Sequence, residues 1–200
     1  MSIGDGYVHK CTRSKSCLLC VKHSTKQNEY ILYKKNLLES LGCCNINLHY
    51  IDNNGYSGVY FTKADSYFRC IRKWLYKDGK KVISRFLLDK LTPEGIAIWY
   101  MDDGNLSAKK RNGKVHAYEL FLNTHTSKEN NQIIIDYFLD VWNVRFHQVK
   151  NKGSYRLRMS TREIRRFLPI FENFVIPSMN YKINMQRHEC GASNLDDDIV

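Results

Sequence analysis

Two aspartates precede a glycine at distant points of the 200-residue chain, Asp5 before Gly6 and Asp103 before Gly104. Carboxylate oxygens are the ligands that hard cations such as Mg²⁺ prefer. If the fold brings the two acids together, they form a site whose bound cations activate water and stabilise the leaving oxygen of a phosphodiester. Asp102 and Asp103 alone are more simply explained as solvated acids at a helix end. The second acid at Asp5 favours the metal site.

Three further pairs of residues repeat in the same order at nearly the same distance. They are His23 with His125, Lys26 with Lys128, and the lysines of Lys80-Lys81 with Lys182. Repeats in one order at nearly one offset indicate two related subdomains, whereas a solenoid needs shorter and more numerous units. The two histidines are expected to contact phosphate, to cap the helices that follow them or to lie at the surface, rather than to take part in catalysis.

The hydrophobic pattern predicts the same series of elements in each half, with strands from alternation and helices from three- and four-residue spacing. The predicted strands are 16–23, 46–51, 58–61, 117–124, 145–149 and 154–159, and the predicted helices are 27–41, 65–77, 127–142 and 161–174. The predicted class is therefore α+β, with the series αββαββα occurring twice. The predicted domains are a first half 1–84, a connector 85–92, a second half 93–187 and an acidic polar tail 188–200.

The segment from Thr92 to Gly104 predicts the motif helix of the second half. Thr92 is suited to the N-cap and Pro93 to the first helical position. The interior is apolar on every side, which predicts a buried helix. Gly104 predicts a left-handed stop. Acids at the C-terminal end of a helix are unfavourable, and a bound cation would remove that cost.

The composition limits the partner and the compartment. A formal net charge of +11 in a chain with 43% hydrophobic residues favours nucleic acid over a membrane. An apolar run of spanning length and a signal peptide are both missing from the sequence. Seven scattered cysteines fit reduced thiols inside a cell. Cys17, Cys20 and His23 permit a zinc interpretation, which is disfavoured because a second pair at finger-like spacing is lacking.

Ile96–Gly104 resembles the nine-residue signature of the LAGLIDADG homing endonucleases, and Met1–Gly6 resembles the tail of a first copy. The segments 91–93, 122–124 and 176–182 resemble the monomeric, two-motif branch of that family. The likeness covers nearly the whole chain to about residue 185. It departs from the family where only four residues precede Asp5, so the first motif helix is expected to be truncated.

The resemblance implies two saddle-shaped antiparallel sheets that straddle DNA. It also implies that Asp5 and Asp103 bind the metal ions, Mg²⁺ with Mn²⁺ as a substitute, and that Lys81 and Lys182 assist the chemistry. The alternative lysine Lys80 stays open. Asp102 occupies a small-residue position of the signature and is left out of the catalytic pair.

Basic residues on or between the predicted strands are the expected DNA contacts, although some of them are ordinary solvated residues. They are Lys10, Arg13, Lys15, Lys22, Lys109, Lys110, Arg111, Lys114, Lys150, Lys152, Arg156 and Arg158.

The leading hypothesis is a monomeric, site-specific double-strand DNA endonuclease with a long asymmetric target and short 3′ overhangs. An RNA maturase that binds intron RNA is one alternative, and a DNA-binding relic that does not cleave is another. A membrane partner is not expected. The expected location is a bacterial or phage-host cytoplasm, with an organelle as the alternative.

Overall fold

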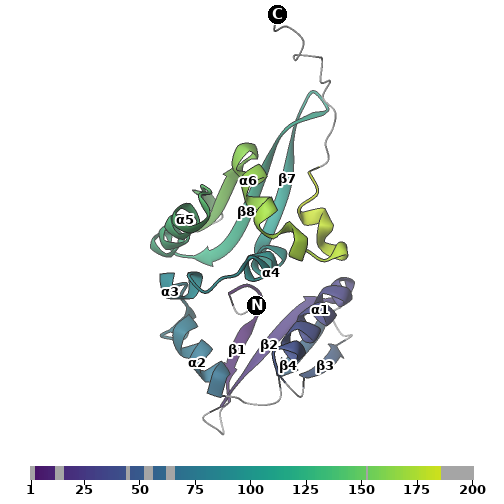
Figure 1. Cartoon of the computed structure of the whole chain (residues 1–200), viewed down its shortest axis with the longest axis vertical. Coiled ribbons are helices and arrows are strands. Elements are labelled where there is room, and N and C mark those ends of the chain that lie inside the picture. Colours follow the sequence, from purple (N-terminus) through teal and green to yellow (C-terminus); the bar gives the residue numbers. More distant parts are fainter. Residues whose placement is uncertain are drawn as a thin grey trace, which may run out of the picture.

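The computed structural model describes residues 3–11, 16–43, 46–51, 56–61, 66–151 and 153–185. The chain forms two halves in which strands and helices follow one another in a similar order, and helix α4 lies where the halves meet (Figure 1). The first half contains β1 Tyr7–Lys10, β2 Cys17–Ser24, η1 Thr25–Gln27, α1 Asn28–Ser40, β3 Ile46–Ile51, β4 Tyr56–Phe61, α2 Ser66–Leu75, β5 Tyr76–Lys77 and β6 Lys80–Lys81. The connector contains α3 Arg85–Leu88. The second half contains α4 Pro93–Asp103, β7 Gly104–Arg111, β8 Lys114–Thr126, α5 Lys128–Trp142, β9 His147–Asn151, β10 Ser154–Ser160, α6 Thr161–Phe171, η3 Glu172–Phe174 and η4 Pro177–Lys182.

Each half builds one four-stranded antiparallel sheet. The strand orders are β1-β2-β4-β3 and β7-β8-β10-β9, so the second strands of the two hairpins pair at the centre of each sheet. The two orders are equivalent, which confirms the α+β class. The series αββαββα is complete in the second half, whereas the described part of the first half starts with a turn where the first helix is predicted. The hairpin of β7 and β8 extends well beyond the body of its sheet (Figure 1).

Helices cover one face of each sheet. In β2 the residues Cys17, Leu19 and Val21 are buried while Lys22 is exposed, and α1 and α2 pack against this sheet. In the second half Leu120 and Leu157 are buried toward α5 and α6. Because side chains alternate between faces along a strand, each sheet keeps an opposite face that these helices do not cover. We call these the open faces.

Helix α4 is the centre of the larger core. The Thr92 hydroxyl caps it by accepting a hydrogen bond from the Gly95 N–H at 3.1 Å, and every residue of Ile96–Met101 is buried. The predicted left-handed stop at Gly104 is wrong, because its φ is −82° and β7 begins there. Glycine is needed instead for space, since a Cβ would lie 2.2 Å from the Tyr100 ring.

Two short elements position the end of the first half. The hairpin of β5 and β6 turns through Asp78 and Gly79, both with positive φ, and places Lys81 at its end. Helix α3, which the sequence did not predict, follows and buries Leu88. Of the first motif, Ile3–Asp5 form a turn rather than a helix. The predicted domain boundaries stay a prediction, and residues 186–200 lie outside the described residues.

Candidate functional site

The two predicted acids lie where the halves meet. Asp103 is the last residue of α4, and Asp5 lies in the turn before β1. The Asp5 N–H donates to Asp102 Oδ2 at 3.1 Å and so fastens this turn to the end of α4. Burial and the charge of Asp5 raise the pKa of Asp103 to about 7, and burial and the charge of Asp102 raise the pKa of Asp5. The acids therefore form one concentration of negative charge.

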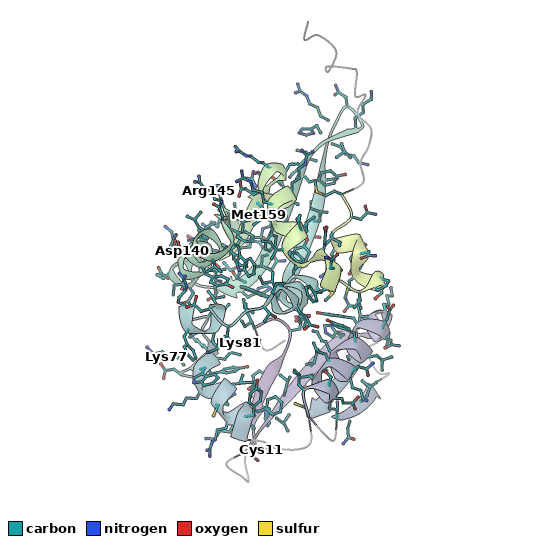
Figure 2. All side chains as sticks on the ribbon, in the orientation of Figure 1. Cys11, Lys77, Lys81, Asp140, Arg145 and Met159 are labelled. Carbon is teal, nitrogen blue, oxygen red and sulfur yellow. The ribbon has the colours of Figure 1, made fainter. Side chains whose placement is uncertain are left out.

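The two predicted lysines hold the backbone on either side of this centre. Lys81 Nζ donates to the carbonyls of Gly4 and Gly6, both at 2.7 Å, and Figure 2 shows Lys81 near the middle of the molecule. Lys182 Nζ donates to the carbonyls of Met101 and Asp102. The two contacts are equivalent, because each lysine binds the chain beside one acid. Burial lowers the pKa of both lysines.

The structure brings Lys81 to the acids and leaves Lys80 exposed. The Tyr100 hydroxyl donates to the Lys182 carbonyl at 2.7 Å and fixes the segment that carries this lysine. The Asn123 amide donates to the Asp103 carbonyl at 3.0 Å. Each lysine thus reaches the site from the end of its own half.

Asp102 is the most enclosed acid of the site. Its side chain is fully buried, and Lys34 Nζ donates to Oδ1 at 2.5 Å. The Tyr30 hydroxyl donates to the same oxygen at 2.7 Å. Burial opposes the charged form of this carboxyl, but the Lys34 ammonium and the Tyr30 hydroxyl outweigh it, so the pKa of Asp102 is lowered. Asp102 is an ion-paired structural carboxylate in this arrangement.

The prediction that His23 lies at the surface or caps the following helix is wrong, since Ser24 and Gln27 are the N-caps of η1 and α1. Its side chain is 3% exposed, its Nε2 is 2.9 Å from Lys34 Nζ, and its Nδ1 is 3.7 Å from Asp5 Oδ2. Burial and the charge of Lys34 lower the pKa of His23 to about 4, so its ring is neutral at pH 7. The physical reason is strand parity, since His23 shares the buried side of β2 with Val21.

His125 is not the structural counterpart of His23. Gly104 pairs with Leu122, and the register of β1 and β2 continues to place Gly6 opposite Val21. Thr124 therefore corresponds to His23. His125 is exposed and has a φ of +47°. The repeated histidine in the sequence is a coincidence of position, whereas the repeated acids and lysines meet at one centre.

Three groups lie close enough to hold a metal ion. One ligand atom each from Asp5, His23 and Asp102 lies within 4.8 Å of the others. Asp102, however, directs one oxygen to Lys34 and the other to the Asp5 N–H, and His23 directs Nε2 to Lys34. Burial and the charge of Asp102 raise the pKa of Asp5, and burial and the charge of Asp5 raise the pKa of Asp103. A divalent cation beside these two carboxylates would relieve both effects.

The zinc interpretation fails on strand geometry. Cys17 and Cys20 both lie in β2, three residues apart, so their side chains leave opposite faces of the sheet. Cys17 is buried under the helices, and His23 is engaged with Lys34.

The predicted DNA contacts that lie among the described residues divide into three groups. Lys22, Lys109, Arg156 and Arg158 belong to the open faces by strand register. Lys110, Arg111 and Lys114 are exposed at the end of the β7–β8 hairpin. Lys10 shares its side of β1 with buried Val8, and Lys150 shares its side of β9 with Gln148, which contacts α5 through Gln132. Arg13, Lys15 and Lys152 lie outside the described residues.

Two interactions on the open faces could not be predicted from the sequence. Glu119 accepts from Lys109 at 2.7 Å and from Arg158 at 3.0 Å, so it orders both cations. The Arg156 guanidinium lies 3.8 Å above the Phe121 ring, and its Nε is buried without a hydrogen-bond partner. Strand alternation placed these residues on one face, but cross-strand register is needed to pair them.

The roles of Lys34 and Tyr30 at the site were not predicted either, although the sequence contains a pattern that indicates their burial. Tyr30, Lys34 and Leu38 are spaced by four residues and are all buried in α1. A charged residue in the middle of an apolar stripe indicates a buried ion pair. Its partner could not be read from the sequence, because Asp102 is 68 positions away.

The raised pKa of Asp103 predicts how stability depends on pH. This carboxyl titrates near 3.8 in the unfolded chain and at about 7 in the folded protein. Between these values the folded state holds the extra proton, so the free energy of unfolding falls as pH rises. His23 has the opposite effect between pH 4 and 6.5, since its pKa is lowered.

We therefore expect Asp103→Asn to gain stability relative to wild type as pH rises from about 5 to 8 in a chelator. Melting temperatures of both proteins across this range measure the difference. A constant difference would contradict a raised pKa at Asp103.

The fold is a pseudo-symmetric pair of antiparallel sheets on either side of the motif helix, with one acid from each half at their junction. A model of the LAGLIDADG DNA endonuclease family matches residues 2–167, and the chain belongs to this family. This confirms the resemblance in the sequence.

Two relatives and one solved structure illustrate the likeness. The cytochrome b mRNA maturase bI2 of Debaryomyces hansenii is 28% identical over 90% of this chain and 70% of that protein. Protein RecA of Mycobacterium leprae is 29% identical over 90% of this chain but only 26% of that protein. The homing endonuclease I-WcaI, solved bound to its DNA recognition sequence, has a TM-score of 0.73 at 23% identity, covering 91% of this chain and 81% of that chain.

Among the described residues, a helix long and apolar enough to cross a membrane is lacking.

Proposed function

We propose that the protein is a site-specific double-strand DNA endonuclease that depends on a divalent cation. The observation that carries this proposal is the meeting of Asp5 and Asp103, one from each half, with Lys81 and Lys182 fastened beside them. Each half thereby contributes one acid and one lysine to a single centre. A pseudo-symmetric centre of this kind suits the hydrolysis of two strands of an asymmetric duplex.

The acids and the lysines of the site have different roles. Asp5 and Asp103 would hold Mg²⁺ or Mn²⁺, which when bound supplies charge stabilisation to the scissile phosphate and lowers the pKa of water. Lys81 and Lys182 fix the backbone at the acids and add positive charge where negative charge develops on phosphate. Trp99 Nε1 donates to Asp103 Oδ2 at 3.2 Å and orients this carboxylate.

End-mapping of genomic DNA tests the proposal directly. Purified protein is incubated with DNA of the source organism and Mg²⁺, and a parallel sample contains a chelator. We expect breaks at one or a few loci with Mg²⁺ and background without it. Discrete breaks in the chelator, or random nicking in Mg²⁺, would contradict the proposal.

The open faces are the proposed DNA interface. Arginine reads guanine through two parallel hydrogen bonds in the major groove. Arg156 is suited to this because the Phe121 ring holds its guanidinium in place. Lys109 and Arg158 are partly neutralised by Glu119, which also offers an acceptor for a cytosine amino group.

We expect Arg156→Ala to relax sequence preference at one base pair, by about 1–3 kcal/mol. Lys150→Ala in the neighbouring strand β9 is the matched control, since Lys150 lies on the side of the sheet that faces the helices. Selection of bound duplexes from a randomised library measures both variants. Equal loss of sequence preference in the two variants would show that the open face that carries Arg156 does not recognise the bases.

A second candidate function is the binding of intron RNA, as the name of the maturase relative suggests for that protein. The observation that favours it is an exposed surface on α2 and α3. Tyr67, Trp74 and Phe86 are 60%, 43% and 50% exposed, and the rings of Trp74 and Phe86 meet edge to face at 5.4 Å. Exposed aromatic rings beside the cations Lys73 and Lys90 are typical of surfaces that stack unpaired bases.

Substitution of both Trp74 and Phe86 by alanine tests this candidate. We expect the affinity for a mixed-sequence single-stranded RNA to fall at least about tenfold, since one stacked base contributes about 1–3 kcal/mol. Duplex DNA binding should not change, because α2 packs on the face opposite the open face. Filter binding measures both affinities. Unchanged RNA affinity would show that this aromatic surface does not bind RNA.

A further inference from the structure

A chain of polar contacts runs from buried Asp102 to the partly exposed Asp5 through two buried side chains that the mechanism above does not use. Lys34 Nζ is 2.5 Å from Asp102 Oδ1 and 2.9 Å from His23 Nε2, and it lies 4.3 Å from the centre of the Tyr30 ring. Lys34 is 1% exposed and His23 is 4% exposed. A chain of this kind is costly to bury unless each contact is satisfied.

The hydrogen-bond donors and acceptors of these groups determine which ring nitrogen of His23 carries the hydrogen. An ammonium has three N–H donors and no acceptor, so Lys34 can only donate to His23 Nε2. Nε2 must therefore carry a lone pair. In a neutral imidazole the hydrogen is then on Nδ1. Nδ1 faces Asp5 Oδ2 at 3.7 Å, and the Gln27 side chain also hydrogen-bonds the ring.

We propose that His23 is a positioning residue for the first-half acid, held by Lys34 in the tautomer that directs its Nδ1–H at the Asp5 carboxylate. Asp5 needs such a contact because it stands in a turn, whereas Asp103 is carried by the rigid end of α4. The Asp102 carboxylate holds the backbone of Asp5 by accepting a hydrogen bond from the Asp5 N–H. His23 orients the Asp5 side chain. Lys34 joins the two contacts.

The equivalent position in the second half supports the assignment. Thr124, the counterpart of His23, donates its hydroxyl to Asn131 Oδ1 at 2.5 Å. Asn131 is fully buried. The histidine contact is therefore specific to the half whose acid stands in a turn. This inference rests on the proposed function only for the role of Asp5.

Nitrogen-15 NMR of the histidine rings tests the tautomer without metal or DNA. We expect the His23 signals, assigned by their loss in His23→Gln, to show a proton on Nδ1 and none on Nε2. In Lys34→Met we expect the proton to leave Nδ1 for Nε2, the form that free histidine favours, while the matched control Lys35→Met keeps the wild-type signals. Protonated Nε2 in the wild type would overturn the proposal, even if Lys34→Met does not fold.

Mn²⁺ binding, followed by electron paramagnetic resonance, tests the consequence for Asp5. We expect His23→Leu to weaken Mn²⁺ binding about 10–100-fold, as loss of an outer contact to a ligand does. His23→Asn, whose amide N–H can take the place of Nδ1–H, should restore most of the affinity. Equal loss in both variants would overturn the positioning role. Absence of Mn²⁺ binding in the wild type would instead overturn the proposed function, and the NMR result would still decide the tautomer.

Discussion

Lys34→Met is expected to lower the free energy of unfolding by about 3–5 kcal/mol, the largest loss of stability for any single change at this site. The substitution leaves the Asp102 carboxylate fully buried without its ammonium partner. The Tyr30 hydroxyl and the Asp5 N–H remain, but neither carries charge. Urea denaturation at neutral pH measures the loss as a lower midpoint with an unchanged slope.

The neighbouring lysine provides the matched control. Lys35 pairs with Glu39 at 2.7 Å on the exposed side of the same helix, so Lys35→Met should cost about 0.3–0.5 kcal/mol. Lys34→Met combined with Asp102→Asn should recover part of the loss, because the unpaired charge is then absent. A loss below about 1 kcal/mol for Lys34→Met would contradict a buried, charged pair.

Asp103→Asn is expected to reduce cleavage by more than about 100-fold, since loss of a ligand exceeds the effect of losing an outer contact. DNA binding should persist or tighten, because one negative charge is removed beside the phosphates. The loss of rate and the gain of stability at high pH have one origin, the buried charge of Asp103.

Single-turnover cleavage and duplex affinity together measure this prediction. Asp140→Asn is the control, since Asp140 is exposed and pairs with Arg85 on the outer surface. Cleavage by Asp103→Asn within a few-fold of the wild type would remove Asp103 from the site.

Much of the fold could be predicted because local pattern and fold agree. Alternation in β2 and β8 and the capping residues of α4 fix these elements within a few residues. The repeated Asp-Gly pairs predicted the two acids, and the structure brings both to the junction of the halves. Helix α3 was missed because four residues are too few to show a helical period.

The remaining features depend on contacts between distant segments. The pairing of Lys34 with Asp102 spans 68 positions, so the buried stripe of α1 could reveal the charge but not its partner. His23 was misplaced although its parity with Val21 in β2 indicates burial. For Lys10 and Lys150, strand parity was available in the sequence but the covered face was known only from the structure.

Strand-resolved cleavage shows whether Asp5 and Asp103 act at one centre. A plasmid that carries a mapped locus is incubated with Mg²⁺ and wild type, Asp5→Asn or Asp103→Asn. We expect cuts in both strands by wild type and near-complete loss of both cuts in each variant. Either variant cutting both strands at the wild-type rate would contradict the shared centre.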